Sequence, residues 1–450
     1  MYPPKGRAWL LLILAPTVCV ASCAKRDPIN PDNLDSTKAP AFVGAPTSDI
    51  VFISTQMNPV EEAGKMRNVI LKDFPGKVDF RPNDNGYLLR QFEMLLKTDP
   101  SASILIGALH SDLVTLQGQG VLLPLAAFPS GIGNRDIPDN LMQLSKLDGE
   151  SSYYVPWMQA SFVMVANKKA LAFLPERAVL GELTYDQLFQ WAKNIYDRKG
   201  LKALGFPAGE KGLIHRFFQG YLYPSYTARA VLKFRSVEAR GMWDFFRGLW
   251  QLTDPGSLVY STMAEPLITE DVWIAWDHTA RLVKAFEERP NDFIAFPAPI
   301  GPRGRGFTPI ISGLAIPAAV GDRASPAMLI NYLTSPAIQH RTLLETGFFP
   351  VVSSGMESGV PERLKALVAA VDAQTNSRLS IPTLLPSGLG ERGADYNSLF
   401  VLTFSEIVLD GKEIGTVLDE NAAELQLIID EQNVKGWLPD DSGARPIKIE

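Results

Sequence analysis

The chain has 450 residues, of which 46% are hydrophobic and 20% are charged, and its formal net charge is −6. This length is too great for one ordinary core and suits two lobes of about 150–200 residues each, and the composition is that of a soluble globular protein rather than a disordered or membrane-spanning one. No block of Lys or Arg stands out, which disfavours nucleic-acid binding because that function depends on clustered basic charge.

The N-terminus has the pattern of a secretory signal. Lys5 and Arg7 precede an apolar run from Ala8 to Val20 that is too short to span a bilayer. The run ends in Val-Ala-Ser-Cys, which resembles the lipobox at which bacterial lipoproteins are cleaved and diacylated. We therefore predict a signal peptide over residues 1–22 and a lipid on Cys23, which would anchor the protein to the outer face of the cytoplasmic membrane. Ordinary cleavage beside an incidental cysteine is the alternative.

Residues 23–48 are predicted to be a flexible tether, because they are rich in proline and aspartate and lack apolar periodicity. From Asp49 onward, short apolar runs at 50–53, 78–80 and 104–106 predict buried strands, and each is followed by a polar turn and a stretch of helical periodicity. This alternation predicts an α/β fold with a mostly parallel sheet, whose ligand-binding loops lie beyond the C-terminal ends of the strands.

Two proline-containing stretches predict crossings between the lobes. Pro156 interrupts a strand-like run over residues 153–165, and a second α/β region follows, in which Thr184 and Gln187 predict a helix capping box. Farther on, a strand-like run at 293–296 is followed by prolines, and a strand that ends in Pro-x-Pro must leave its sheet. The predicted lobes are residues 49–156 with 298–348, and residues 157–297 with 349–450.

Several motifs occur along the chain in the order known from one family. They are ASILIGALHSDLVTLQGQGVLLPL, YYVPWMQASFVMVANKKAL, VWIAWDH, FPAPIGPRGRG, SGLAIP, TGFFPVV and a final AAELQLIIDEQ helix. Residues 48–435 thereby resemble the family 1 extracellular solute-binding proteins, the maltose-binding-protein-like receptors of ABC importers, most often of the carbohydrate branch. The chain departs from the family pattern at Asp112 and at Gln56-Met57-Asn58, where aromatic residues are usual.

The resemblance implies a two-lobe periplasmic-binding-protein-like fold that closes on a solute and delivers it to an ABC transporter permease. A sugar ligand and no cofactor are expected, and the chain is expected to act as a monomer. No enzyme activity is expected, because the four histidines are scattered and neither His-Glu-x-x-His nor Gly-x-Ser-x-Gly occurs. A glycosidase with two cleft carboxylates stays open as an alternative.

Sugar recognition needs flat aromatic rings for the C–H face of the sugar, and carboxylates or amides for its hydroxyl edge. The polar turns and strand ends supply this mixture, and the candidate ligand-binding residues are Gln56, Asn58, Asn83, Asp84, His110, Asp112, Trp157, Gln159, Trp276 and Asp277. Trp276 is the first choice because it ends a predicted strand before a polar turn, although a core tryptophan would show the same pattern.

Asp277 and the two arginines of the GPRGRG segment each have two interpretations. Asp277 could cap the following helix instead of accepting a ligand hydroxyl. Arg303 and Arg305 keep a second ligand class open, a phosphorylated polyol such as a glycerophosphodiester, although a solvated Gly-rich loop is the favoured interpretation of this segment.

Overall fold

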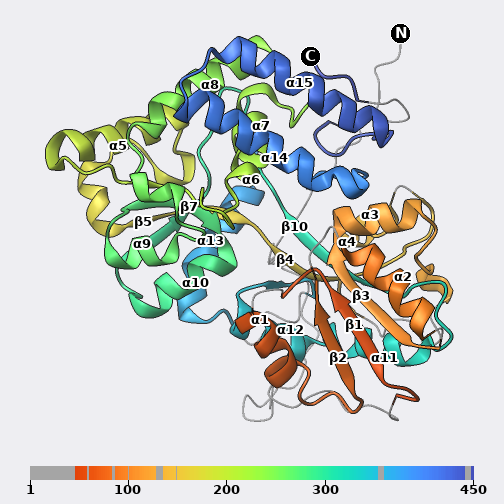
Figure 1. Ribbon diagram of the computed structural model, residues 1–450. Helices are drawn as coiled ribbons and strands as arrows, with labels where there is room; N and C mark the ends of the chain where they lie inside the picture. Colours follow the sequence, from red (N-terminus) through yellow and green to blue (C-terminus); the bar gives the residue numbers. More distant parts are fainter. Residues whose placement is uncertain are drawn as a thin grey trace, which may run out of the picture.

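The computed structural model describes residues 46–57, 60–83, 87–99, 101–127, 135–147, 149–352, 359–440 and 447–450. Within these ranges the chain forms two α/β lobes, each built on its own sheet (Figure 1). The predicted signal peptide, Cys23 and most of the predicted tether lie outside the described residues, as do Asn58 and Asp84. None of the helices in the described ranges is both long and apolar enough to cross a membrane.

Lobe 1 contains a six-stranded sheet in the order β11-β4-β10-β3-β1-β2. Its strands are β1 (Ile50–Ser54), β2 (Val78–Pro82), β3 (Ser103–Leu109), β4 (Val155–Ala160), β10 (Ile310–Ala315) and β11 (Phe349–Pro350). The three N-terminal strands pair in parallel, whereas β10 runs antiparallel to both β3 and β4. The sheet is therefore mixed rather than mostly parallel, because β10 returns from the other lobe and enters from the opposite end.

Helices cover this sheet, and they are α1 (Val60–Lys65) with its continuation η2 (Met66–Ile70), α2 (Leu88–Thr98), α3 (His110–Gly118), α4 (Asp139–Leu144), α11 (Ala324–Leu333) and α12 (Pro336–Thr346). The central strands form where the sequence predicts them, because Phe52 and Ile104–Ile106 are fully buried between the helical layers. The polar segment before β1 is held at Asp322, whose carboxylate accepts hydrogen bonds from Thr47 (3.3 Å) and Ser103 (2.8 Å).

Lobe 2 contains a four-stranded sheet in the order β6-β7-β5-β8, and a separate pair of parallel strands, β9 and β12. The strands are β5 (Phe162–Asn167), β6 (Leu204–Gly205), β7 (Ile274–His278), β8 (Phe293–Phe296), β9 (Arg305–Phe307) and β12 (Ser380–Pro382). The central strand β5 is antiparallel to both of its neighbours, β7 and β8.

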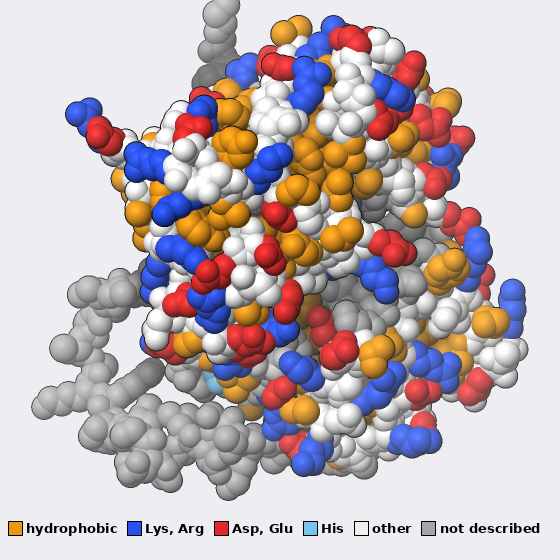
Figure 2. All heavy atoms as spheres, turned by 60° about the vertical axis from the view of Figure 1, so that its left-hand side comes forward, with side chains coloured by type: hydrophobic (Ala, Val, Ile, Leu, Met, Phe, Trp, Pro, Cys, Tyr) orange, Lys and Arg blue, Asp and Glu red, His pale blue; other side chains and the backbone are white. Residues whose placement is uncertain are grey.

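The helices of lobe 2 are α5 (Tyr185–Lys199), α6 (Ile214–Phe217), η7 (Phe218–Leu222), α7 (Tyr223–Thr227), α8 (Val237–Trp250), α9 (Ala264–Thr269), α10 (Thr279–Glu288), α13 (Glu362–Thr375), α14 (Gly393–Phe404), η11 (Ser405–Leu409) and α15 (Ile414–Glu431). Short 3-10 turns are η4 (Leu125–Ala127) in lobe 1, and η5 (Lys168–Phe173), η6 (Leu180–Glu182), η8 (Pro255–Leu258) and η10 (Gly390–Arg392) in lobe 2. On the face of the described residues that Figure 2 shows, acidic and basic side chains are interspersed.

The described parts of the chain place three of its connections between one lobe and the other. The chain passes from β4 to β5 through Ser161, from β9 to β10 through Thr308 and Pro309, and from β11 to α13. Residues 157–160 and 349–350 therefore pair within the sheet of lobe 1, and β9 pairs within lobe 2, in contrast to the predicted lobe boundaries.

The prolines explain these differences. Pro156 lies inside β4, opposite Gly313, at a register shift in the pairing with β10, and such an irregularity is how a strand accommodates proline. Pro297 and Pro299 do follow the end of β8, but the chain forms β9 in lobe 2 before it crosses.

Hydrogen bonds fasten the first two crossings to each other. The Ser161 hydroxyl donates to the carbonyl of Thr308 (3.0 Å), and the Gln374 amide donates to the Ser161 hydroxyl (3.2 Å). The Tyr221 hydroxyl accepts from the backbone N–H of Phe162 (3.1 Å). Because all five residues are buried, these bonds hold the two crossing segments side by side at the base of lobe 2.

Candidate functional site

Polar side chains of lobe 1 gather at the C-terminal ends of β1, β2 and β3. The backbone N–H of Thr55 donates to the carbonyl of Gly107 (2.9 Å), and that of Asn83 donates to the last residue of β1 (2.8 Å). The turns that carry Gln56 and Asn83 and the first turn of α3, which carries Asp112, therefore lie together. These three of the sequence-predicted ligand residues meet at one edge of the sheet.

The Asp112 carboxyl is a titratable group at this edge. Its Oδ2 accepts a hydrogen bond from the Thr55 hydroxyl (3.3 Å). Burial raises the pKa of Asp112 to about 7, against the opposing effects of hydrogen bonds from Thr55 and the Leu109 backbone and of the positive charge of Arg216. The carboxyl is therefore partly protonated at neutral pH, and can donate as well as accept a hydrogen bond.

Arg216 belongs to lobe 2 and faces Asp112 across the lobe boundary. Its Nη1 donates to the side-chain oxygen of Gln219 (2.9 Å), and the Gln219 amide donates in turn to Asn397 on α14 (3.0 Å). Burial lowers the pKa of Arg216 to about 10, while the nearby Asp112 and Tyr396 act to raise it. The guanidinium is thus held in place and stays charged. We call Thr55, Asp112, Arg216, Gln219 and Asn397 the interlobe cluster.

Two further pairs of oppositely charged residues lie across the lobe boundary from each other. Arg90 of α2 pairs with Glu391 of η10 at 2.9 Å. Burial raises the pKa of Glu62 on α1, and the positive charge of Arg281 on α10 opposes this effect. The two lobes therefore present complementary charges to each other around the interlobe cluster.

Trp276 is not at a strand end. Strand β7 continues to His278, so the indole of Trp276 lies inside the sheet of lobe 2 and is fully buried. It stacks on Phe162, with 4.6 Å between ring centroids, and meets the edges of Phe217 (5.1 Å) and Tyr221 (5.2 Å). These contacts are those of a core side chain, although the indole Nε1 has no hydrogen-bond partner among the described residues.

Three other sequence-predicted residues make contacts inside lobe 1, and of these Trp157 and Gln159 are buried and His110 is half-buried. Trp157 packs against Phe52, with 5.5 Å between ring centroids. The Gln159 amide donates to the carbonyl of Pro350 (2.7 Å) and so fastens β11 to β4. His110 shares a hydrogen bond with the Tyr154 hydroxyl (3.0 Å), and burial lowers the pKa of His110 to about 4, which keeps the imidazole neutral.

Asp277 holds the loop before α9 rather than capping α10. Its carboxylate accepts hydrogen bonds from the backbone N–H groups of Met263 (2.8 Å) and His278 (2.7 Å). The N-cap of α10 is His278, whose Nδ1 accepts from the N–H of Ala280 (3.3 Å). Burial raises the pKa of Asp277 to about 6, and its two backbone hydrogen bonds act in the opposite direction.

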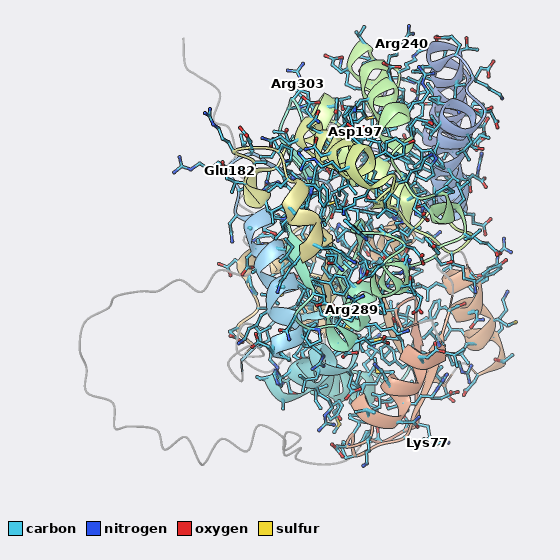
Figure 3. The ribbon with its side chains drawn as sticks, turned by 90° about the vertical axis from the view of Figure 1, so that its left-hand side faces the viewer. Lys77, Glu182, Asp197, Arg240, Arg289 and Arg303 are labelled. Atoms are coloured by element: carbon cyan, nitrogen blue, oxygen red, sulfur yellow. The ribbon has the colours of Figure 1, made fainter. Side chains whose placement is uncertain are left out.

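The two arginines of the GPRGRG loop make their contacts within lobe 2. Arg303 pairs with Glu238 on α8 (3.2 Å) and points outward at the surface (Figure 3). The predicted solvated loop is wrong for Arg305, which is fully buried and donates a hydrogen bond to the carbonyl of Gly181.

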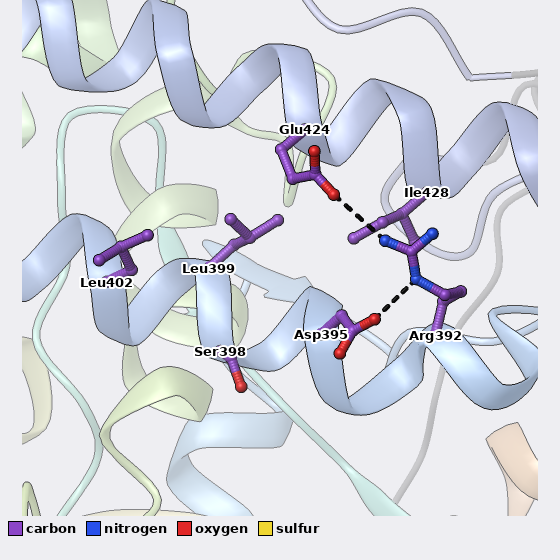
Figure 4. A pocket seen from close by; sticks show the side chains of 7 residues that line it. All are labelled: Arg392, Asp395, Ser398, Leu399, Leu402, Glu424 and Ile428. Atoms are coloured by element: carbon purple, nitrogen blue, oxygen red, sulfur yellow. Dashed lines mark hydrogen bonds and ion pairs between the residues drawn. The ribbon is translucent and has the colours of Figure 1, made fainter.

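A hollow of about 250 Å³ lies between α14 and α15 (Figure 4). Leu399, Leu402 and Ile428 form its apolar wall. The charged groups at its rim are paired with one another, since Arg392 bonds Asp395 (2.7 Å) and Glu424 (3.1 Å). No polar group is left to converge on a ligand, and the hollow is a weaker candidate site than the interlobe cluster.

Arg216 and Gln219 are not among the site residues predicted from the sequence. Both belong to the apolar segment LIHRFFQGYL, and they are three residues apart, which places them on the same face of a helix. A charged residue in such a segment is seldom buried without a specific partner, and this signal could have identified them.

Comparisons with known proteins agree with this architecture. The model of a family described as bacterial extracellular solute-binding protein matches residues 95–369. No curated protein matches the chain.

Several solved structures share the fold. The sugar-binding protein MalE from Xanthomonas citri is 16% identical over 86% of this chain and 98% of its own, with a TM-score of 0.67. UgpB from Mycobacterium tuberculosis, solved in complex with glycerophosphocholine, is 20% identical over 86% of this chain and 100% of its own, with a TM-score of 0.66. The GacH receptor of Streptomyces glaucescens, solved unliganded and with acarbose, is 14% identical over 85% and 99%, with a TM-score of 0.64.

Proposed function

Because this chain belongs to the bacterial extracellular solute-binding proteins, we propose that it captures a carbohydrate between its two lobes and delivers it to an ABC transporter permease. The observation that carries the proposal is the interlobe cluster. It combines a carboxyl, a guanidinium, amides and a hydroxyl from both lobes, which are the donors and acceptors that sugar hydroxyls require.

The ligand contacts that we propose on lobe 1 are Gln56, Asn83 and Asp112. The side-chain amide nitrogen of Asn83 is buried without a hydrogen-bond partner among the described residues, which supports a role in holding a ligand. Asn58 and Asp84 are close to these residues in the chain and stay proposed contacts. A contact from Trp276 would require its Nε1 to reach the ligand from within the core.

Related structures support the sugar class, since their ligands include acarbose, maltose and α-D-tagatose. The alternative is a phosphorylated polyol, the class to which the glycerophosphocholine bound by UgpB belongs. Arg303 and Arg305 no longer favour this alternative, because their contacts lie away from the interlobe cluster.

We also propose that Cys23 carries a lipid that keeps the receptor at the outer face of the cytoplasmic membrane, as the lipobox-like residues 20–23 suggest. Mass spectrometry of the mature N-terminus tests this proposal, and an unmodified Cys23 would contradict it.

A thermal-shift screen of sugars against organic phosphates tests the binding function. A ligand that binds only the native state stabilises it by about 2.7 kcal/mol at a hundredfold excess over Kd. We expect saturable protection by a sugar and recovery of incubated oligosaccharides without hydrolysis. Protection by none of the compounds, or the appearance of hydrolysis products, would contradict the proposal.

A further inference from the structure

Met57, in the turn that follows β1, has a strained backbone. Its φ is +60°, in the left-handed region where the Cβ atom of a side chain is crowded against the backbone. Five other non-glycine residues in the described ranges have a positive φ, and each of them lies in a turn or at the end of a helix. Of the six, Met57 is the one that comes after a strand, and it is the one that is buried, with 2% of its surface exposed.

The buried side chain of Met57 explains how this backbone conformation is kept. The side chain belongs to the main hydrophobic core, and the free energy of its burial offsets the steric cost of the left-handed backbone. Strain of this kind persists only where the surrounding structure enforces it, and it is concentrated at ligand-binding and active sites. The position of Met57 beside the predicted ligand residues fits that pattern.

The residues just before Met57 form a chain of hydrogen bonds that leads to Asp112. The backbone N–H of Gln56 donates to the Ser54 hydroxyl (3.0 Å), and the Gln56 side-chain amide donates to the Thr55 hydroxyl (3.4 Å). The Thr55 hydroxyl donates in turn to the Asp112 carboxylate (3.3 Å). The φ of Met57 sets the angle between its anchored side chain and the peptide plane that it shares with Gln56. A change in this φ would therefore move the Gln56 amide away from Thr55.

We infer that Met57 is a positioning residue for the ligand contact of Gln56. Its buried side chain and its left-handed backbone together fix the turn at residues 54–57, so that the Gln56 amide is already in place when a ligand arrives. A preformed contact does not have to be ordered during binding, and this raises the affinity. The inference rests on the proposed solute-binding function, in which Gln56 and Asp112 are ligand contacts.

Three substitutions separate the effect of the backbone from that of the side chain. Met57→Leu keeps a buried side chain of similar volume. Met57→Gly removes the side chain but adopts a positive φ without steric cost. Met57→Ala removes the side chain and keeps the steric cost, so its backbone favours the right-handed region. We therefore expect the turn to be held as well in Met57→Leu as in the unsubstituted protein, less well in Met57→Gly, and least well in Met57→Ala.

Hydrogen exchange of the full chain without ligand measures the turn directly. The backbone N–H of Thr55 donates to the Gly107 carbonyl (2.9 Å) and that of Gln56 to the Ser54 hydroxyl (3.0 Å), so both are protected while the turn is held. We expect these two N–H groups to exchange about tenfold faster in Met57→Ala than in Met57→Gly, the factor that corresponds to the cost of a left-handed backbone. Equal exchange in the two variants would overturn the inference.

Calorimetric titration connects the turn to binding. The probes are glucose, galactose, maltose and glycerol 3-phosphate, and the probe that the unsubstituted protein binds most tightly is used for every variant, with sucrose excluded and at a temperature where all variants are folded. We expect Met57→Leu to bind normally, and Met57→Ala to bind about tenfold more weakly than Met57→Gly. If the Met57 side chain itself contacted the ligand, the glycine and alanine variants would be weakened alike.

Arg177 provides the matched control. It also has a left-handed backbone, with a φ of +63°, but it is exposed in a turn of lobe 2. Arg177→Ala should melt at a lower temperature than Arg177→Gly for the same steric reason, and the two variants should bind the probe equally.

The outcomes separate the inference from the proposed function. Equal affinity in Met57→Ala and Met57→Gly, with the expected difference in exchange, would show that the turn is structural only, and it would overturn the inference while leaving solute binding intact. Binding of none of the probes by the unsubstituted protein would contradict the proposed function, and with it the role of Met57 in binding.

Discussion

At the scale of single residues, Trp276 shows how packing and recognition share one sequence pattern. Its indole is surrounded by Phe162, Phe217 and Tyr221, and it is fully buried. We expect Trp276→Ala to lower the free energy of unfolding by about 3–5 kcal/mol, the usual cost of removing a large buried aromatic ring. Denaturant unfolding measures this loss, and Trp276→Phe should recover much of it. A Trp276→Ala variant with unchanged stability and lost ligand binding would show instead that the ring contacts the ligand.

Single residues also differ in how far their positions could be predicted from the sequence. The shared position of Gln56, Asn83 and Asp112 could be predicted, because polar residues that follow consecutive parallel strands meet at one edge of a sheet. Trp276 was misplaced because the apolar run ends two residues before the strand does. Arg216 could not be paired with Asp112, because they are brought together by the arrangement of the lobes rather than by local pattern.

At the scale of elements, the start of α5 is a confirmed prediction. The Thr184 hydroxyl accepts from the N–H of Gln187 (3.1 Å), and the Gln187 side chain accepts from the N–H of Thr184 (3.0 Å). We expect Thr184→Ala to lower the free energy of unfolding by about 1 kcal/mol, because the N–H of Gln187 at the helix start loses its hydroxyl acceptor. Thr184→Ser keeps the hydroxyl and should be nearly neutral in the same denaturant titration. Equal losses in both variants would contradict a capping role.

Strand positions were more predictable than strand partners. Short buried runs located β1, β3 and β8, because their apolar side chains are covered on both faces. The pairing of β9 with β12 joins residues more than 70 positions apart, and no short sequence pattern predicts it. That pairing keeps β9 in lobe 2 and moves the second crossing to Thr308 and Pro309.

At the scale of the two lobes together, the chain crossings join the lobes, and oppositely charged side chains also meet across their boundary. The crossings are held together by Ser161, Tyr221 and Gln374, and Arg90 pairs with Glu391 across the lobe boundary. Such an arrangement permits rotation about the crossings, and a ligand that touches both lobes favours the closed arrangement through its additional contacts.

Small-angle scattering of the protein with and without the ligand that protects it tests the central claim, capture of a solute between two lobes. We predict that the radius of gyration falls on saturation, and that the fall is lost in Arg216→Gln at the same ligand concentration. An unchanged radius of gyration, with calorimetry showing the site to be full, would contradict capture by closure of the lobes.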